Sequence, residues 1–349
     1  MSSKEKFLEK YQKVPVQEYP NKTSDKRPMV SIITLAYQHE NFISNSLDGM
    51  LMQQTDFDFE ILIGEDESSD KTREICIEYT KKRPDKIRLF LHSRENNVEV
   101  YGKPTAYFNF QYLIYEAKGK YLAICEGDDF WTDPLKLQKQ VDFLENNQDY
   151  GLIYSDINIV DEFGNDSDTP LISGYKKRYN RIKDTYQSGN IFWNILEKNK
   201  INTLTVCVRK KLIIDYLANF QFEEFSYDHR KWMHVASYSK IKFNKEKWGS
   251  YRTTDQGMSN SNGFFDKRSP LIKQSALVHY LNLINFDSKR IDYRIFYKVI
   301  YIILMSNHLS LKEKKPTIKL LITRPKYFIG LLKYKLGNIN NRLFHTHDN

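Results

Sequence analysis

The 349-residue chain has few cysteines, no long apolar run and no glycine-rich loop after its first predicted strand. The three cysteines, Cys76, Cys125 and Cys207, are far apart and form neither a disulfide framework nor a zinc-binding pattern, so a reducing compartment is expected. The longest apolar run, Val299 to Met305, is far shorter than the ~20 residues that a membrane-spanning helix needs. The first residues also lack the apolar stretch of a signal peptide. These absences predict a cytoplasmic protein that is soluble or lies peripherally on a membrane.

The composition is that of a folded protein, with 40% hydrophobic and 28% charged residues but only 14 glycines and 10 prolines. This length allows one large α/β domain with an appendage, or two domains. The formal charge of +9 is compatible with nucleic acid, an acidic membrane surface or an anionic substrate as a partner. Lys and Arg crowd the segment from Lys312 onward, whereas the acidic motifs lie in the N-terminal half.

Apolar, β-branched segments alternate with helical patterns over residues 29–160. Strands are predicted over 30–36, 59–64, 87–91, 121–125 and 151–155, and helices over 40–54, 69–83, 105–117 and 133–147. Farther along the chain, helices are predicted over 191–197 and 225–239, with Asp228 near the start of the second, and a strand over 203–208. Such alternation predicts a mainly parallel, doubly wound sheet with helices on both faces. Residues 165–190 look like a polar loop, either a mobile flap or a solvated connection. The segment from about Pro270 is expected to form a basic helical extension.

The acidic segment Glu126-Gly127-Asp128-Asp129 directly follows the predicted strand over 121–125. Three carboxylates within four residues repel one another unless a cation lies among them. Oxygen ligands of this kind suit Mg²⁺ or Mn²⁺, and these ions are often held together with substrate phosphates. The alternative is an acidic turn that precedes a helix cap.

Three further polar segments are found at predicted strand ends or at the start of a helix. In chain order, the four segments are Thr34-Leu35-Ala36-Tyr37, Glu65-Asp66-Glu67-Ser68-Ser69-Asp70, Glu126-Gly127-Asp128-Asp129 and Tyr227-Asp228. In an open α/β sheet, the first three would meet at the carboxyl edge of the strands, where ligands bind.

This order resembles the family 2 glycosyltransferases with a GT-A fold, over about residues 28–261. Thr34 and Tyr37 match the Thr-x-x-Tyr-Asn pattern common in that family, with Gln38 in place of the asparagine. Asp66, Ser68 and Asp70 match its Asp-Asp-x-Ser-x-Asp pattern, in which Glu65 replaces the first aspartate.

Two other motifs depart from the family pattern at one position each. Glu126 stands at the first position of the metal motif Asp-x-Asp-Asp. In the segment that resembles Tyr-Arg-x-His, Thr254 replaces the histidine.

The resemblance implies a role for each matching residue. Asp66 would accept a hydrogen bond from the uracil of a UDP-sugar, Asp128 would bind Mn²⁺ or Mg²⁺, and Asp228 would be the general base. The remaining contacts with the nucleotide-sugar would come from Thr34, Tyr37, Glu126, Gly127 and Asp129. Asp66 and Asp228 could instead be acids that stabilise helix starts. Thr34 could be an ordinary strand residue. Arg94 and Lys103 could meet the pyrophosphate, but a solvated loop is the favoured expectation for both.

The implied function is a metal-dependent inverting hexosyl- or hexosaminyltransferase that acts on a glycan or lipid-linked acceptor in surface polysaccharide biosynthesis. Residues 1–28 would be a polar leader, residues 29–265 the catalytic domain and residues 266–349 the basic helical region. Within the catalytic domain, residues 29–160 would bind the nucleotide-sugar and residues 161–265 would carry the acceptor site and the base.

Three alternatives belong to other functional classes. A sugar nucleotidyltransferase would need a glycine-rich phosphate loop after the first strand, where this chain reads Ala36-Tyr37-Gln38-His39-Glu40-Asn41. A non-catalytic nucleotide-sugar-binding module remains open because of the departures at Glu65, Glu126 and Thr254. Nucleic-acid binding through the basic tail is not expected. That tail either contacts the inner face of an anionic membrane or packs on the catalytic domain.

Overall fold

A computed structural model describes residues 2–20, 27–100, 103–183, 185, 187–219, 228–253 and 264–344. The chain divides into two compact units. The first contains residues 1–191 and 200–257, and the second contains residues 192–199 and 258–349.

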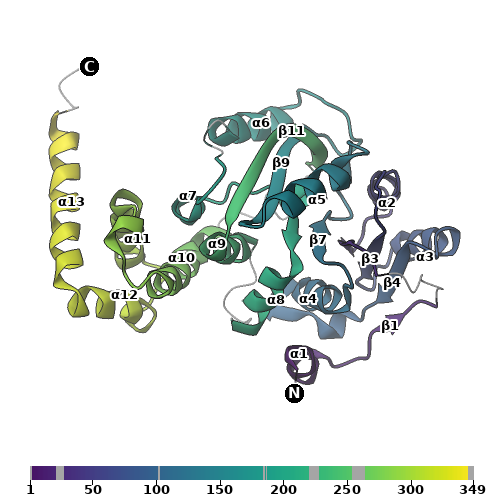
Figure 1. The fold of residues 1–349 in the computed structure, drawn as a ribbon, viewed down its shortest axis with the longest axis horizontal. Coiled ribbons are helices and arrows are strands. Elements are labelled where there is room, and N and C mark those ends of the chain that lie inside the picture. Colours follow the sequence, from purple (N-terminus) through teal and green to yellow (C-terminus); the bar gives the residue numbers. More distant parts are fainter. Residues whose placement is uncertain are drawn as a thin grey trace. The chain divides into compact units, whose positions relative to one another are not determined.

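The described part of the first unit is built on a nine-stranded sheet with the order β1-β4-β3-β2-β7-β10-β9-β11-β8 (Figure 1). In this order the strands are Gln17–Glu18, Ile87–Leu91, Phe59–Glu65, Val30–Ala36, Tyr121–Ile124, Cys207–Arg209, Tyr150–Val160, Lys240–Arg252 and Phe130–Trp131. Strands β4, β3, β2 and β7 are parallel, and β9 is parallel to β11. Strand β10 is antiparallel to both of its neighbours, and the edge strands β1 and β8 are also antiparallel. The predicted α/β class with a mostly parallel sheet is confirmed, with β10 as an antiparallel insertion.

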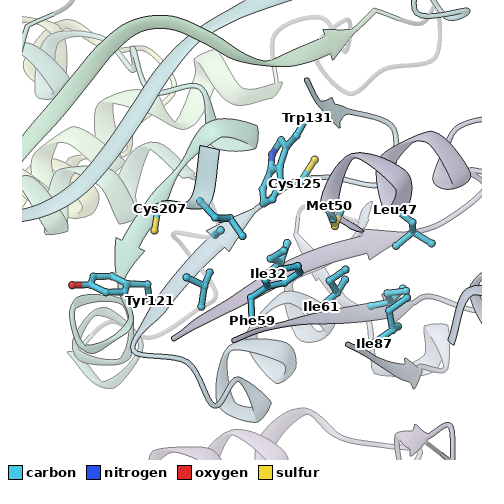
Figure 2. Packing of buried hydrophobic residues seen from close by; sticks show 14 of the residues in the cluster. Ile32, Leu47, Met50, Phe59, Ile61, Ile87, Tyr121, Cys125, Trp131 and Cys207 are labelled. Atoms are coloured by element: carbon cyan, nitrogen blue, oxygen red, sulfur yellow. The ribbon is translucent and has the colours of Figure 1, made fainter. Parts of the chain in front are cut away.

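Helices cover both faces of this sheet, as predicted. Helices α2 (Ile43–Leu51), α3 (Thr72–Lys82) and α5 (Lys136–Asn146) pack on one face. Figure 2 shows Leu47 and Met50 of α2 beside Ile32 and Ile61 of the central strands. Helices α4 (Tyr107–Glu116), α8 (Lys210–Asn219) and α9 (Asp228–Tyr238) pack on the other face. This burial of apolar side chains is the main force that holds the parallel strand ends at one edge.

The N-terminal segment is structured rather than loosely attached. Helix α1 (Ser3–Tyr11) begins with a capping box between Ser2 and Glu5. Phe7 is 4% exposed, and the short strand β1 pairs with the edge strand β4. The attachment of this segment could not be predicted from its polar composition, because helix α1 buries few apolar side chains.

Four elements differ from the sequence-based expectation. Helix α6 (Pro170–Lys183) lies within the stretch expected to be a loop. It is stabilised by tertiary packing, since Ile172, Tyr175 and Tyr179 contact a cluster that includes Ile157 of β9. Strand β11 was not predicted because its middle residues are polar and exposed. The short antiparallel pair β5 (Val98–Val100) and β6 (Lys103–Thr105) was also not predicted.

The described part of the second unit is helical, as expected. It consists of α7 (Phe192–Glu197), α10 (Phe264–Leu283), α11 (Tyr293–Met305), α12 (Leu311–Thr323) and α13 (Pro325–Phe344). The ring of Phe192 stacks on Tyr280 with centroids 3.8 Å apart, and Trp193 Nε1 donates to the carbonyl of Arg290. Within the described residues, no helix is both long enough and apolar enough to cross a membrane.

Candidate functional site

The carboxyl ends of β2, β3 and β7 meet at one edge of the sheet, because these strands are parallel neighbours. Backbone hydrogen bonds join the segments that follow them. The amide of Asp66 donates to the carbonyl of Ala36 at 3.0 Å, and the amide of Gly127 donates to the carbonyl of Leu35 at 3.1 Å. The sheet therefore brings together the first three polar segments that the sequence indicated, as expected for a ligand-binding edge.

The two carboxylate oxygens of Asp66 differ in their hydrogen bonding. Its Oδ2 accepts hydrogen bonds from Arg94 Nη1 at 2.9 Å and from Asn97 Nδ2 at 2.8 Å. Its Oδ1 is buried and has no hydrogen-bond partner among the described residues. Burial raises the pKa of Asp66, while Asn97 and Arg94 partly oppose this. A buried acceptor without a donor is costly, so a ligand N–H at this oxygen would be strongly favoured.

Arg94 is not on a solvated loop, contrary to the expectation from the sequence. Its guanidinium lies 3.9 Å from the centroid of the Tyr37 ring, and it forms an ion pair with Asp66. The Tyr37 side chain is 38% exposed. An exposed aromatic ring beside a buried carboxylate is a suitable surface for a flat, hydrogen-bonding ring.

The loops around Asp66 have unusual backbone conformations. Gln38 and Glu67 have positive φ angles of 56° and 57°. The amide of Gln38 donates to Ser68 Oγ at 3.1 Å, and its side chain donates to Ser69 Oγ at 2.7 Å. Gln38, which replaces the family's asparagine, therefore holds the first polar segment against the second. Positive φ values in side-chain-bearing residues are uncommon and concentrate at functional sites.

Gly127 lies where a larger residue cannot fit. A Cβ atom here would lie 2.6 Å from His39 Nδ1 and 2.7 Å from the carbonyl oxygen of Leu35. The glycine thus allows the acidic turn, defined as residues 126–129, to approach the end of β2 closely. His39 is held from the other side, because its amide donates to Thr72 Oγ1 at 2.7 Å.

Asp128 and Asp129 face different surroundings. Asp129 is 3% exposed, and its Oδ1 accepts a hydrogen bond from the amide of Arg252 at 2.8 Å. Burial and the nearby charges of Asp128 and Glu126 raise the pKa of Asp129 well above its ordinary value. Asp128 is only partly buried, and its carbonyl accepts from Arg252 Nη1 at 2.9 Å. Asp129 therefore anchors β11, whereas the carboxylate of Asp128 is the more accessible of the two.

The acidic turn does not cap the helix that follows it. Leu135, the N-cap of α5, has no side-chain cap, and its amide donates to Asp133 Oδ1 at 2.8 Å. The alternative of an acidic turn followed by a helix start therefore stays open.

Asp228, the first residue of α9, is held by two side chains. Thr203 Oγ1 donates to its Oδ2 at 2.8 Å, and Lys231 Nζ lies 2.7 Å from its Oδ1. Lys231 is 8% exposed, and its Nζ lies 3.8 Å from the centroid of the Phe110 ring. Burial would raise the pKa of Asp228, but the charge and hydrogen bond of Lys231, with the bond from Thr203, lower it. Asp228 is therefore ionised at neutral pH.

Glu126 lies near enough to Asp228 and Asp128 for their negative charges to affect its ionisation. Its pKa is raised to about 8 by burial and by the nearby negative charges of Asp228 and Asp128. It borders a small, largely apolar pocket lined by Ile33, Leu35, Phe110, Ile124 and Cys125. Groups that perturb one another in this way, at the edge of a sheet, are typical of functional sites.

Thr34 lies apart from this edge. It is fully buried, and its Oγ1 donates to Met50 Sδ of α2 at 3.2 Å. This position corresponds to the strand-residue alternative. Thr254, Tyr227 and the residues just before Tyr227 lie outside the described residues.

Sequence reasoning missed Asn97, Thr203, Lys231 and Arg252 as parts of the site. Lys231 could have been suggested by its position, because it lies three residues after Asp228 in the same predicted helix. Arg252 is the arginine of the segment that resembles Tyr-Arg-x-His, so a sequence signal for it was present. Asn97 and Thr203 contact the site from distant parts of the chain, and no local pattern indicates them.

The described residues contain no group of three or more His, Cys, Asp or Glu side chains that could hold a metal ion by themselves. This arrangement still fits Mg²⁺ or Mn²⁺, which are often bound by one or two carboxylates together with substrate phosphates. The partly exposed carboxylate of Asp128 fits that role.

Comparison with known proteins identifies the family. Residues 31–204 match the model of glycosyl transferase family 2. An uncharacterized protein of Mycobacterium tuberculosis (strain ATCC 25618 / H37Rv) is 38% identical over 145 residues, which are 41% of this chain and 40% of that protein. The chain thus spans about two fifths of the length of this relative.

Two further similarities cover more of the chain. The Escherichia coli protein named UDP-Glc:alpha-D-GlcNAc-diphosphoundecaprenol beta-1,3-glucosyltransferase WfgD is 26% identical over 213 residues, 61% of this chain and 72% of that protein. The crystallised mannosyltransferase PcManGT from Pyrobaculum calidifontis has a TM-score of 0.50 at 14% identity, covering 97% of this chain and 94% of its own. This structural likeness shows the fold alone. Because the family model covers the strands and the acidic turn at the carboxyl edge, this chain belongs to glycosyl transferase family 2.

Proposed function

We propose that the protein is a metal-dependent inverting glycosyltransferase. It transfers a sugar from a nucleotide-diphosphate sugar, most simply a UDP-sugar, to a hydroxyl of a glycan or lipid-linked acceptor in surface polysaccharide biosynthesis. The observation that carries this proposal is the arrangement of three aspartates in one unit. Asp66 has a buried oxygen without a donor, Asp128 has an accessible carboxylate, and Asp228 is held ionised by Lys231.

The donor's base is bound by Asp66 and its neighbours. A uracil N–H donates to the free Oδ1 of Asp66, and the base lies beside the exposed ring of Tyr37. A charged acceptor makes this hydrogen bond stronger than one between neutral groups. The relatives differ in the nucleotide of the donor: WfgD is named for UDP-Glc, whereas the structure of PcManGT is a complex with GDP-Man.

A divalent ion is held at Asp128, with Glu126 beside it. The Pyrobaculum mannosyltransferase was crystallised with Mn²⁺. When bound, the ion neutralises the negative charge that develops on the departing nucleotide diphosphate. Gly127 contributes by allowing the acidic turn to approach the end of β2, which fixes the position of Asp128.

Asp228 is the general base. It accepts the proton of the acceptor hydroxyl as that oxygen forms a bond to the anomeric carbon and the bond to the nucleotide diphosphate breaks from the opposite face. This role requires an ionised carboxylate, as in the inverting glycosidases. Lys231 and Thr203 keep the group ionised and fix its orientation through hydrogen bonds to both oxygens.

A three-protein comparison tests the proposal. The wild-type protein is incubated with UDP-, GDP- and dTDP-sugars, with Mn²⁺ or EDTA, and nucleotide release is measured. We expect Mn²⁺-dependent release from at least one donor. Asp228→Asn should lower the rate by about 100-fold or more, the usual contribution of a general base, with nucleotide affinity nearly unchanged. Asp128→Ala should instead weaken the Mn²⁺-dependent binding of the nucleotide.

The outcomes separate the alternatives. Binding without metal-dependent release from any donor would favour a non-catalytic binding module. Full activity of Asp228→Asn would place the base elsewhere, and unchanged metal dependence of Asp128→Ala would contradict the metal site.

The basic helical region is proposed to contact the inner, anionic face of a membrane. Residues 293–344 contain eleven Lys and Arg and a single acidic residue, Glu313. The same region exposes large apolar side chains on α11, α12 and α13, namely Tyr301, Ile302, Met305, Leu311, Ile322, Phe328, Ile329 and Leu332. Interleaved basic and apolar side chains are typical of surfaces that lie on anionic lipid.

Vesicle co-sedimentation tests this contact. The protein should bind vesicles that contain phosphatidylglycerol and not vesicles of phosphatidylcholine alone. Ile322→Glu, which places a negative charge at a side chain that is 73% exposed, should reduce that binding without changing the thermal stability. Equal binding to both kinds of vesicle would contradict the proposal.

A further inference from the structure

The N-terminal strap, defined as residues 3–18, is firmly attached to the first unit. Phe7 of α1 stacks on Phe108 of α4 with ring centroids 5.0 Å apart. At the other end of the strap, Glu18 Oε1 accepts a hydrogen bond from Arg88 Nε at 2.9 Å. Gln17 pairs with Leu91 in the β1–β4 ladder. The strap is therefore held at both ends.

Asn96 joins the middle of this strap to the loop that follows β4. Its Oδ1 accepts hydrogen bonds from the amides of Lys13 at 2.7 Å and Val14 at 2.8 Å. Its Nδ2 donates to the carbonyl of Val14 at 2.8 Å. Asn96 is 1% exposed, so its amide group is used entirely inside the protein.

The same loop carries the two residues that hold Asp66. Arg94 and Asn97, on either side of the Glu95–Asn96 pair, both donate to Asp66 Oδ2. The backbone of this loop is also held from the Asp66 side, because the amide of Arg94 donates to Glu67 Oε2 at 2.7 Å. The loop thus lies between the strap and the proposed nucleobase site, with Asn96 facing the strap and its neighbours facing Asp66.

We propose that Asn96 is a positioning residue through which the N-terminal strap holds Arg94 and Asn97 against Asp66 and thereby sets the affinity for the donor's nucleobase. This inference rests on the proposed function, in which Asp66 binds the base. Fixing the loop before the ligand arrives lowers the entropic cost of binding, which is the general basis of preorganisation. The strap lies outside residues 31–204, so this control is additional to the part that matches the family.

The experiment uses the full chain and measures UDP binding in the presence of Mn²⁺, GDP and dTDP being used if UDP does not bind. Asn96→Ala should weaken nucleotide affinity about tenfold, a typical strength of coupling between two sites. The Michaelis constant for the donor should rise by a similar factor with kcat nearly unchanged. Binding of inorganic pyrophosphate, which has no base, should not change.

Two further variants distinguish positioning from general loosening of the fold. Val14→Pro removes one of the strap's two amide donors to Asn96, leaving that of Lys13, and does not change the loop's own residues, so it should also weaken nucleotide binding. Asn147→Ala removes the hydrogen bond from Asn147 Nδ2 to the carbonyl of Phe143 at the end of α5 and should leave nucleotide affinity unchanged. The second serves as the matched control.

A double-mutant cycle gives the decisive result. If Asn96 acts through the Asp66 site, Asn96→Ala should cost less than about twofold in nucleotide affinity in an Asp66→Asn background. Additive effects of Asn96→Ala and Asp66→Asn would overturn the inference while leaving the proposed function intact. Equal nucleotide binding by the wild-type protein, Asn96→Ala and Val14→Pro would do the same. If the wild-type protein binds none of the three nucleotides, both the proposed function and this inference are wrong.

Discussion

The ion pair between Asp228 and Lys231 leads to a specific prediction about pH dependence. Lys231 Nζ lies 2.7 Å from Asp228 Oδ1, and the side chain of Lys231 is 10% exposed, against 39% for Asp228. The pKa of Asp228 is lowered although burial raises it, because Lys231 and Thr203 stabilise the charged form. Lys231→Met removes the charge and keeps much of the apolar stem that contacts Phe110.

The size of the effect follows from this geometry. A neighbouring opposite charge lowers the pKa of a carboxyl group by roughly 1 to 3 units. The exposure of Asp228 reduces the effect, because solvent screens the pair. In Lys231→Met, the burial of Asp228 is opposed only by the hydrogen bond from Thr203, so the pKa of Asp228 rises.

The role of Asp228 as a general base determines the direction in which the pH dependence of kcat/KM shifts. A base must be ionised, so the rate falls as the pH drops through its pKa. In the wild-type protein this fall lies below the ordinary aspartate value of 3.8. In Lys231→Met this fall moves to higher pH, so kcat/KM should begin to decline at a higher pH than in the wild-type protein.

The assay is the initial rate of nucleotide release between about pH 3 and pH 8 at constant ionic strength, so that it reaches below the ordinary pKa of aspartate. Lys240→Met is the matched control, since Lys240 Nζ lies 2.6 Å from Asp149 Oδ2 in a more exposed ion pair at the start of β11. The control should keep the wild-type profile. The reasoning is refuted if the profiles of Lys231→Met and wild type superimpose.

Two further predictions concern the acidic turn. Gly127→Ala places a Cβ atom 2.6 Å from His39 Nδ1 and 2.7 Å from the backbone oxygen of Leu35. The free energy of unfolding, measured in urea, should therefore fall by about 1–3 kcal/mol. An unchanged midpoint would mean that the turn can move freely. Asp129→Ala leaves the buried amide of Arg252 without its acceptor and should cost about 1–3 kcal/mol, whereas stability equal to wild type would contradict its role as the anchor of β11.

Much of the fold could be predicted from local patterns. Strands β2, β3, β4 and β7 are short, continuous apolar segments, and each is found within a few residues of its predicted bounds. Local patterns were sufficient here because strands buried on both faces need apolar residues at every position. The helices between them follow from apolar residues at helical spacing.

Other elements depend on contacts that no local pattern encodes. A strand is predicted over residues 203–208, but the structure has a 3₁₀ turn at Thr203–Thr205 and the three-residue strand β10 after it. The position of β10 between β7 and β9, antiparallel to both, is what no local pattern indicates. Helix α6 has a polar sequence and is stabilised by packing against β9. The N-terminal strap contains few apolar residues, and its attachment to Asn96 joins positions more than 80 residues apart.

The acidic turn shows most clearly what each source of information determined. The sequence alone determined that carboxylates follow a buried strand, that Asp66 precedes them and that Asp228 follows at the start of a helix. The local chemistry of Asp128 and Asp129 is the same, and only the resemblance to the family assigned the metal to Asp128. The tertiary structure gives the physical difference between them, since Asp129 is buried against the amide of Arg252, 123 residues away, while the carboxylate of Asp128 stays accessible. Which side chain a folded turn buries depends on the distant strand that packs against it.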